Sequence, residues 1–438
     1  MGMTFKGGVH PYDGKELSKD KPVSELLPQG LLVYPLSQHI GAPANPVVAV
    51  GDTVLRGQMI AEAGGFVSSP IFSSVSGTVK AIEARRVATG GTCKSIVIEN
   101  DGEYTETEFK EVEDVTTLDN EEIISRIKNA GVVGMGGAGF PTHVKLSPKN
   151  PENIEYIIAN CAECEPYLTS DYTRMITEPE KLVEGMRIVL NLFPKAKGVF
   201  GVEDNKPEAI AKLRDLTKDE TRMEVAELTT KYPQGGERQL IYAVTKRSIN
   251  SKMLPADAGC IVDNVETLVA IYNAVKFGKP LMDRIFTVTG NAVANPQNFK
   301  IKIGTNYKEL LDAAGGFKTN GCEKIISGGP MMGFAMFDLE VPTTKTTSAL
   351  LCFTKDEVAA FETTNCINCG RCVEACPEQL IPSRLADYGE HGQSDMFEKW
   401  YGLECIECGS CSFACPAKRH LAQSIKTMKK QVLASKRK

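Results

Sequence analysis

Eight of the fourteen cysteines form two copies of one pattern in the last fifth of the chain, and this doubled run constrains the fold more than any other feature. Each copy reads Cys-x-x-Cys-x-x-Cys-x-x-x-Cys-Pro, from Cys366 to Pro377 and from Cys405 to Pro416. In two-cluster ferredoxins, three closely spaced thiolates wrap one [4Fe–4S] cluster while the cysteine before proline reaches the other cluster. The spacing therefore predicts two clusters with crossed ligands.

The crossed arrangement assigns Cys366, Cys369, Cys372 and Cys415 to one cluster, and Cys405, Cys408, Cys411 and Cys376 to the second. A zinc ribbon would need only two separated cysteine pairs and has no role for a third cysteine in each run. Structural disulfides belong to oxidising compartments. Two clusters held this close together form a relay that moves electrons one at a time.

Composition narrows the remaining classes of function. The 438 residues carry 50 basic and 55 acidic side chains, a net charge of −5, so nucleic acid is not an expected partner. Residues 1–21 lack the apolar core of a secretory signal, and we expect a cytoplasmic chain. The longest uncharged stretch, residues 26–51, is interrupted by four prolines and is expected to form strands and turns. Any contact with a membrane is therefore expected to be indirect.

A glycine-rich segment runs from Gly131 to Lys145. It formally contains G-x-G-x-x-G, but the apolar spacing in residues 120–129 predicts that a helix precedes it, whereas a Rossmann site needs a strand there. Five glycines in nine residues still allow the backbone to approach a phosphate or a flat ring. A plain structural turn is the alternative interpretation.

The middle of the chain alternates between strand and helix patterns. The predicted strands are 154–159, 198–202 and 224–228, and the predicted helices are 178–193, 207–216 and 236–245. Such alternation predicts a parallel sheet covered on both faces, with ligands at the carboxyl ends of the strands. Polar segments at 160–166, 232–238 and 263–267 are expected at that edge.

Four motifs occur here in a fixed order: GxGGAGFPTxxK from Gly134, NxxExEP from Asn160, YxxGxE from Tyr232 and NVETL from Asn264. Together they resemble the NADH- and FMN-binding flavoprotein subunit of respiratory complex I, over residues 115–336. With the doubled cysteine run and the opening Phe5-Lys-Gly-Gly-Val-His-Pro11, the whole chain resembles the RnfC family, the C subunits of Rnf complexes. These complexes are bacterial membrane-bound ferredoxin:NAD⁺ oxidoreductases, of the translocase class, coupled to Na⁺ or H⁺ transport.

The resemblance implies FMN as a cofactor, NAD(H) as substrate and a specific set of contacts. The implied cofactor-binding residues are Gly134, Gly136, Gly137, Ala138, Gly139, Phe140, Lys145, Asn160, Glu163, Glu165, Gly235, Glu237, Asn264 and Thr267. The glycine loop would line the FMN phosphate and the nicotinamide side, and Lys145 would neutralise flavin or phosphate charge. The family's acidic residue before Glu163 is Ala162 here, and the first Glu of its GEE run is Gly236. No catalytic acid or base is implied, because hydride transfer depends on placement.

Two flanking segments complete the expected architecture. Residues 47–62 and 69–82 resemble the halves of a lipoyl-type barrel-sandwich domain, but the hairpin tip at 64–68 has no lysine to modify, so a structural or docking role is expected. Residues 284–337 resemble the β-grasp module that follows the flavin domain in complex I.

We therefore expect a multidomain α/β protein with four parts. These are a barrel-sandwich domain at 1–114, a Rossmann-like α/β flavin and NAD domain at 115–282, a β-grasp domain at 283–345 and a two-[4Fe–4S] ferredoxin-like α-helical domain at 346–438. The expected location is the cytoplasmic face of the bacterial cell membrane. The expected partners are the other Rnf subunits, including one iron–sulfur subunit that accepts electrons from ferredoxin.

Three other interpretations stay open at this point. Cys161-x-x-Cys164 could act as a redox dithiol, although Pro166 follows at once and a thioredoxin-like motif needs a helix there. The layout of flavin, β-grasp and two-cluster modules also occurs in the cobalamin reductase of diol-degrading microcompartments. The chain could instead be a scaffold protein that carries clusters and binds no nucleotide.

Overall fold

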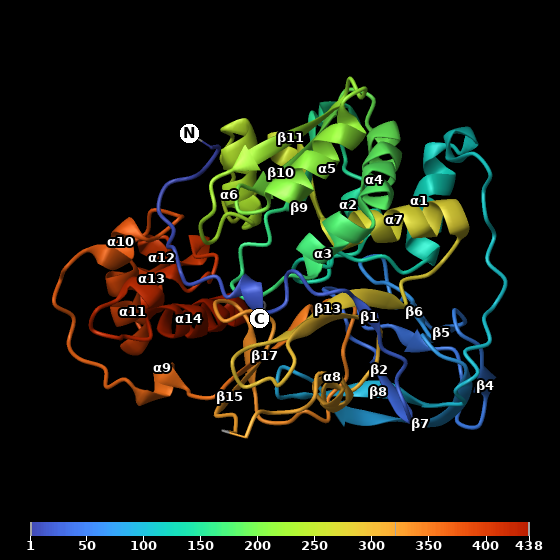
Figure 1. The fold of residues 1–438 in the computed structure, drawn as a ribbon. Coiled ribbons are helices and arrows are strands. Elements are labelled where there is room, and N and C mark those ends of the chain that lie inside the picture. The colour runs from blue at the N-terminus through green and yellow to red at the C-terminus, as the bar shows by residue number, and fades with distance from the viewer. Residues whose placement is uncertain (1, 320, 437–438) are drawn as a thin grey trace.

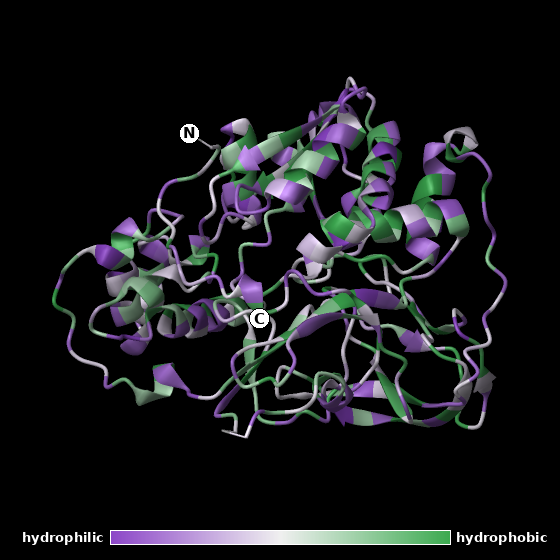
Figure 2. Ribbon diagram, in the orientation of Figure 1, coloured by the Kyte–Doolittle hydropathy of each residue, from purple (hydrophilic) through white to green (hydrophobic). Residues whose placement is uncertain are grey.

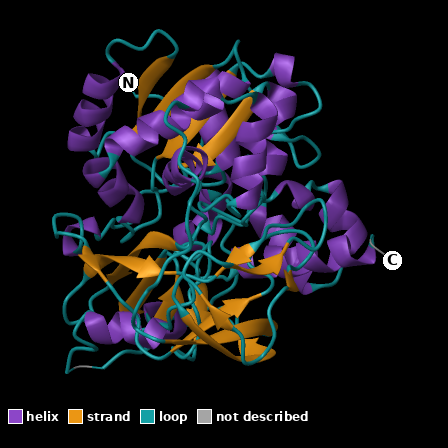
Figure 3. Ribbon diagram, turned by 90° about the vertical axis from the view of Figure 1, so that its right-hand side faces the viewer, coloured by secondary structure: helices purple, strands orange, loops and turns teal. Residues whose placement is uncertain are grey.

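The computed structural model describes residues 2–319 and 321–436. Figure 1 shows helices and strands of the middle of the chain at the top, the N-terminal strands and the strands after α7 at the bottom, and the C-terminal helices at the left. Turned by 90°, Figure 3 shows the helices packed around the upper sheet and strands dominating the lower part. Among the described residues, no helix has both the length and the apolar character that crossing a membrane requires.

The N-terminal region forms two small sheets around one core. One sheet has the order β2-β8-β7-β4 and the other β3-β5-β6. The strands are β2 (Leu31–Pro35), β3 (Asn45–Pro46), β4 (Thr53–Val54), β5 (Met59–Glu62), β6 (Ile71–Phe72), β7 (Gly77–Arg86) and β8 (Thr92–Asn100). Leu32, Ile60 and Ile96 are fully buried between the sheets, as expected for a barrel-sandwich domain.

The middle of the chain folds into a parallel sheet with the order β11-β10-β9-β12. Its strands are β9 (Tyr156–Cys161), β10 (Lys197–Glu203), β11 (Met223–Leu228) and β12 (Cys260–Asn264). The helices are α1 (Asn120–Asn129), α2 (Thr142–Lys145), α3 (Ser170–Thr177), α4 (Pro179–Leu192), α5 (Pro207–Thr217), α6 (Glu237–Thr245) and α7 (Val265–Phe277). Figure 2 shows hydrophilic and hydrophobic residues alternating along α1 and α4, the pattern of helices with one buried face.

Local signals explain several of these boundaries. Asp119 caps α1 by accepting a hydrogen bond from the Glu122 N–H at 2.8 Å, and Asn264 caps α7 by accepting one from the Glu266 N–H at 2.9 Å. Helix α7 ends at Gly278, whose φ of 68° lies in the left-handed region that glycine enters without strain. The Asn264 cap places the end of β12 directly at the start of α7.

A second, mixed sheet has the order β1-β14-β13-β17-β15-β16. Its strands are β1 (Ser24–Glu25), β13 (Asp283–Thr289), β14 (Gln297–Lys302), β15 (Lys324–Ser327), β16 (Phe334–Met336) and β17 (Ala349–Phe353), with α8 (Tyr307–Ala313) against it. Strand β17 pairs parallel with β13 and antiparallel with β15. The sheet therefore extends past residue 345, and its first strand comes from the N-terminal region.

The C-terminal unit is helical. It contains α9 (Glu357–Ala360), α10 (Arg371–Glu374), α11 (Pro382–Glu390), α12 (Ser394–Lys399), α13 (Ser410–Ala414) and α14 (Leu421–Ser435). Leu385, Phe397 and Ile425 form its buried centre together with several of the cysteines. Lys429 in α14 pairs with Glu407, and Lys436, directly after this helix, pairs with Glu398; Arg437 and Lys438 lie outside the described residues.

Candidate functional site

The glycine loop lies between α1 and α2, on the side where β12 ends. Gly136, Gly137 and Ala138 are exposed, and the backbone N–H groups of the two glycines donate to no acceptor among the described residues. A Cβ at Gly136 would lie 2.9 Å from the Cβ of Asn264, whereas Gly137 has open space around it. Gly136 thus allows the loop to approach Asn264, and the free N–H groups suit a phosphate.

Both ends of this loop are fixed to the protein. The Met135 N–H donates to Thr267 Oγ1 at 3.0 Å, and the Gly134 N–H donates to the Phe140 carbonyl at 2.9 Å. Gly139 has a φ of 72°, and a Cβ there would lie 2.8 Å from a methyl carbon of Thr346. The Ile40 N–H donates to the Ala138 carbonyl at 3.2 Å, so the N-terminal region and the segment before β17 both contact the loop.

Three polar segments meet at the carboxyl edge of the parallel sheet, as the sequence predicts. Asn160 Nδ2 donates to the Gly235 carbonyl at 2.8 Å, which joins the end of β9 to the segment before α6. Asn264 Nδ2 donates to Asp171 Oδ2 at 2.7 Å, which joins the end of β12 to α3. These amides fix the loops that surround the edge.

Lys145, at the end of α2, lies over this edge. Its Nζ donates to the Val262 carbonyl at 2.6 Å and lies 3.2 Å from Asp263 Oδ1. Burial lowers the pKa of Lys145, but the charges of Asp263 and Glu237 outweigh it, so the net pKa is raised. Asp263 Oδ2 is buried and has no hydrogen-bond donor among the described residues. This cationic position beside free N–H groups fits an anionic flavin or phosphate.

The carboxylate of Glu163 is engaged within the protein. Glu163 Oε1 and Oε2 accept the backbone N–H groups of Asp171 and Tyr172 at 2.7 and 3.2 Å, at the start of α3. The residue has a φ of 47° and is buried, and burial raises its pKa although Lys15 and Lys206 oppose the shift. This arrangement gives Glu163 a role in holding α3 and the loop after β9.

Glu165 joins the same loop to the second sheet. Its carboxylate accepts the backbone N–H groups of Met331 at 3.1 Å and Met332 at 2.8 Å, in the turn between β15 and β16. Burial raises the pKa of Glu165 to about 7. Lys15 completes the junction, because its buried Nζ donates to the carbonyls of Glu163, Glu165 and Leu168.

The pair Cys161 and Cys164 does not have the setting of a reactive dithiol. Cys161 is fully buried, and Cys164 accepts a hydrogen bond from the Gly235 N–H with 3.2 Å between nitrogen and sulfur. Burial raises the pKa of both thiols well above the usual value. A reactive cysteine needs a lowered pKa, so these side chains serve packing.

The structure gathers part of the doubled cysteine run. Cys372, Cys376 and Cys411 lie in one buried cluster of the helical unit, and Cys405 and Cys415 pack against it. In residues 2–319 and 321–436 no three His, Cys, Asp or Glu side chains come close enough to share a single metal ion. A [4Fe–4S] cluster binds each thiolate to a different iron, so its ligands stand farther apart than those of a single ion. Cys366 and Cys369 lie exposed on the surface.

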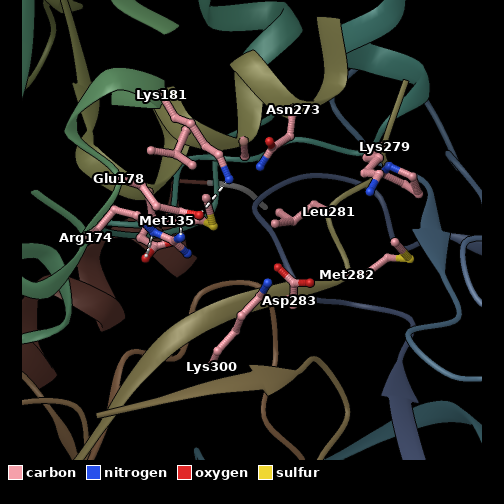
Figure 4. A pocket seen from close by; sticks show the side chains of 14 residues that line it. Met135, Arg174, Glu178, Lys181, Asn273, Lys279, Leu281, Met282, Asp283 and Lys300 are labelled. Carbon is pink, nitrogen blue, oxygen red and sulfur yellow. Dashed lines mark hydrogen bonds and ion pairs between the residues drawn. The ribbon is translucent and has the colours of Figure 1, made fainter. Parts of the chain in front are cut away.

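The pocket in Figure 4 lies behind the glycine loop, between α7 and the second sheet. Its volume is about 50 Å³, and Met135 reaches it from the loop. Arg174 forms a buried pair with Glu266, with nitrogen–oxygen distances of 2.9 and 3.1 Å, and also pairs with Glu178. The volume and the internal pairing identify it as part of the structural support beneath the loop.

Sequence reasoning missed several residues that shape this site. Lys15, Asp263, Lys206 and Met331 were not among the predicted contacts. Lys206 is 1% exposed, and its Nζ donates to the Ala162 carbonyl at 2.6 Å. Asp263 belongs to the polar segment 263–267 that the sequence places at the sheet edge, although no cofactor contact was predicted for it. Lys15 and Met331 come from segments far away in the sequence, and no local pattern marks them.

Comparison with known proteins matches each part of the chain to a family of domains. The family model of the RnfC barrel sandwich hybrid domain matches residues 3–103, the Nuo51 FMN-binding domain 127–273, the SLBB domain 285–335 and the 4Fe-4S dicluster domain 365–421. The C subunit of the Na(+)-translocating ferredoxin:NAD(+) oxidoreductase complex of Acetobacterium woodii is 44% identical over 99% of this chain and 98% of that protein. The chain belongs to this RnfC family.

Two further members of the family are similar to this chain over most of its length. The C subunit of the proton-translocating ferredoxin:NAD(+) oxidoreductase complex of Clostridium ljungdahlii is 45% identical over 97% of this chain and 93% of that protein. The C subunit of the ion-translocating oxidoreductase complex of Pseudomonas aeruginosa is 40% identical over 87% of this chain and 49% of that protein. The expected architecture is thereby confirmed: a barrel-sandwich domain, an FMN-binding α/β domain, a β-grasp-type module and a dicluster domain.

A solved structure shares the fold over most of the chain. An NAD+-reducing [NiFe]-hydrogenase in the air-oxidized state matches with a TM-score of 0.50 and 20% identity, over 73% of this chain and 62% of that chain. The likeness concerns the fold alone. As a family member with these domains, the chain takes FMN and two [4Fe–4S] clusters as cofactors.

Proposed function

We propose that the chain is the NAD(H)-reacting subunit of a membrane-bound ferredoxin:NAD⁺ oxidoreductase complex coupled to Na⁺ or H⁺ translocation. The observation that supports this most is the junction of the two redox units. The polar edge of the parallel sheet and the cysteine-rich helical unit pack against each other through Tyr232, whose hydroxyl donates to the Cys408 carbonyl at 2.8 Å. FMN-based hydride chemistry and single-electron relay need such proximity.

Each side chain at the edge then has a specific task. The N–H groups of Gly136 and Gly137 would hold the FMN phosphate, and Lys145, kept charged by Asp263, would face anionic atoms of the flavin. Asn264 and Thr267 would hold the glycine loop against that phosphate. Asn160 and Gly235 would lie beside the flavin ring, and Phe140 and Glu237 beside the nicotinamide. Bound FMN exchanges a hydride with NAD(H) and passes electrons on singly.

Glu163 and Glu165 act differently from direct ligands in this proposal. Both carboxylates accept backbone N–H groups, so they fix the loop after β9 and the turn before β16. They position the site rather than contact the nucleotide.

The proposal extends to partners and location. The chain would lie on the cytoplasmic face of the membrane and contact other subunits, one of which accepts electrons from ferredoxin. We propose the module boundaries 1–114 and 115–282 for the first two modules. The third module, expected at 283–345, continues through Phe353 because β17 pairs within its sheet, and the fourth then covers 354–438.

Anaerobic purification tests the function. The protein should contain one FMN and about eight iron atoms per chain, a count that follows from two [4Fe–4S] clusters, and NADH should bleach the flavin and cluster absorbance. A chain that retains its iron but lacks flavin and does not respond to NADH would instead be a cluster-carrying scaffold.

A further inference from the structure

The two groups of cysteines occupy different environments, which sequence symmetry does not reveal. Cys372, Cys376, Cys408 and Cys411 are buried, whereas Cys366 and Cys369 are exposed. Both exposed cysteines belong to the first run. In Figure 1 the segment that joins α9 to α10 follows the outer edge of the molecule, away from the parallel sheet.

The second run, by contrast, packs against the α/β domain. Cys408 shares a buried apolar cluster with Val9, Tyr232 and Ala375, against which Cys164 and Met331 pack. The Gly8 N–H donates to the Ala375 carbonyl at 2.9 Å, beside Cys376. The fourth cysteine of the first run is therefore on the inner side, with the second run, as the crossed assignment requires.

A continuous set of contacts leads from the sheet edge to this inner group. A Cβ at Gly235 would lie 3.2 Å from Cys164 Sγ and 3.3 Å from Asn160 Oδ1. Tyr232 lies three residues before Gly235 and donates its hydroxyl proton to the Cys408 carbonyl. Asn160, Cys164 and Tyr232 therefore span the distance between the proposed flavin edge and Cys408.

Polar contacts fix the same interface. Arg238 Nη1 lies 2.8 Å from Glu378 Oε2 and 3.0 Å from Glu404 Oε2. Gln239 Nε2 donates to Glu378 Oε1 at 2.6 Å. Glu378 follows Cys376 by two residues and Glu404 directly precedes Cys405, so the first turn of α6 holds the inner cysteines in place.

We infer that the two clusters have a fixed order: the cluster on Cys376, Cys405, Cys408 and Cys411 is the inner one, beside the flavin, and the cluster on Cys366, Cys369, Cys372 and Cys415 is the outer one, which exchanges electrons with a one-electron protein partner at the surface around Cys366 and Cys369. This inference rests on the proposed function for its flavin, but the placement of the clusters does not.

Electrons and protons balance when the transfer from NADH proceeds in one-electron steps. NADH loses a hydride, which carries two electrons and one proton, and becomes NAD⁺. The electrons cross to the inner and then the outer position one at a time, each step oxidising the donor and reducing the acceptor by one electron, and the proton passes to solvent. The reverse flux uses the same order.

Surface exposure can be measured without turnover. In the holoprotein reduced with dithionite, a soluble lanthanide chelate should speed the electron spin relaxation of one cluster signal much more than the other. The affected signal should be the one that Cys369→Ser removes. An effect confined to the signal that Cys408→Ser removes would overturn the proposed order, whether or not the protein binds flavin.

Two further variants make the test independent of ligand loss. Tyr232→Phe keeps every cysteine but leaves the Cys408 carbonyl without its hydroxyl donor, so the midpoint potential of the inner cluster should shift while that of the outer cluster stays constant. Tyr401→Phe is the matched control, because Tyr401 is 70% exposed and lies in the helical unit that holds Cys408. It should change neither midpoint potential. A shift of the outer signal alone in Tyr232→Phe would contradict the inference.

Reduction by NADH then links the order to the proposed function. In Cys369→Ser, NADH should still reduce the inner cluster, whereas in Cys408→Ser it should reduce the outer cluster at least tenfold more slowly, although dithionite still reduces it. If neither cluster responds to NADH in the unmodified protein but the relaxation result holds, the order stands and the proposed function fails.

Discussion

At the scale of single residues, the pair Lys145 and Asp263 decides the charge of the proposed flavin site. Asp263 is 1% exposed, and Lys145 is the cation that lies 3.2 Å from it. A buried carboxylate that loses its partner is costly to keep charged. Lys145 therefore has two tasks: it compensates Asp263, and it presents positive charge toward the free N–H groups of the glycine loop.

Replacing Lys145 with methionine should weaken FMN binding at least tenfold, because a charge-assisted contact contributes about 1.5–3 kcal/mol. Titration of the flavin-free protein with FMN measures this effect. Lys149→Met, at an exposed lysine in the same segment, is the control and should bind normally. The double variant with Asp263→Asn separates a folding defect from lost affinity: it should restore thermal stability but not FMN binding. Unchanged affinity in Lys145→Met would exclude the proposed role.

The titration of Glu165 should make stability depend on pH. Its folded pKa of about 7 lies above the ordinary value of 4.5, so the folded state holds a proton that the unfolded state releases. Stability should therefore fall as pH rises from 4.5 to 7, by at most about 1.4 kcal/mol per pH unit, and should level off above 7. Apparent Tm values of the anaerobic holoprotein at pH 5.5 and 7.5 measure this. Glu165→Gln should reduce the difference, and an identical difference in the variant would contradict it.

At the scale of elements, α3 and α6 connect the site to its surroundings. Glu163 accepts two N–H groups at the start of α3, where the helix dipole also favours a negative charge. Arg238, in the first turn of α6, pairs with two acids of the helical unit. Glu163, in the loop after β9, thus ties that loop to α3, and Arg238 ties α6 to the helical unit.

Loss of the Glu163 charge should loosen α3. Glu163→Gln retains the shape of the side chain but not its charge, and the helix should lose about 0.5–2 kcal/mol of stability. Hydrogen exchange of residues 170–177 should become faster in the variant. A matched change at Glu180, an acid in the first turn of α4, should leave those residues unaffected.

Loss of the Arg238 side chain should loosen the helical unit. Arg238→Ala leaves two partly buried acids without their partner, so hydrogen exchange around residues 371–378 and 402–411 should increase. Arg214→Ala removes an exposed pair with Glu227, and such surface pairs contribute roughly 0–1 kcal/mol, so it serves as control. Equal exchange in both variants would argue against α6 as the anchor.

Local patterns predict these elements well, because hydrophobic periodicity and caps are local. The prediction of a helix at 120–129 agrees with α1, and the predicted helix at 207–216 differs from α5 by one residue at its end. The strand β17 was not predicted, since its position between β13 and β15 depends on pairing over long separations. For the same reason the sequence motifs located the Asn160 and Asn264 loops but not the contact of Lys15 with the first of them.

At the scale of the whole molecule, the N-terminal segment connects units that are far apart in the sequence. Met3 bridges to Leu228 and Val9 to Tyr232, while the Gly8 N–H reaches the Ala375 carbonyl. Gly7 has a φ of 79°, and a Cβ there would lie 2.6 Å from the Cys376 carbonyl oxygen. The close approach of this segment to the cysteine unit therefore depends on glycine.

Gly7→Ala should separate the segment from the inner cysteines. The added methyl group meets backbone atoms rather than a flexible side chain, so the segment has to shift. We expect lower iron occupancy after purification and faster proteolysis within residues 2–9, with flavin content unchanged. Gly30→Ala, at a glycine of similar φ with open space around it, is the control for the backbone conformation alone. Normal iron content and normal proteolysis in Gly7→Ala would show that the contact is dispensable.

The contact between Gly8 and Ala375 forms late in biosynthesis, because the two residues lie far apart in the sequence. A ribosome adding about 5–20 residues per second needs roughly 20 seconds to over a minute to make the chain between them. During that interval the first ten residues have no partner in the helical unit. The contact can therefore form only after Ala375 has left the ribosome, and until then Gly7 and Gly8 lack the backbone that they approach in the folded chain.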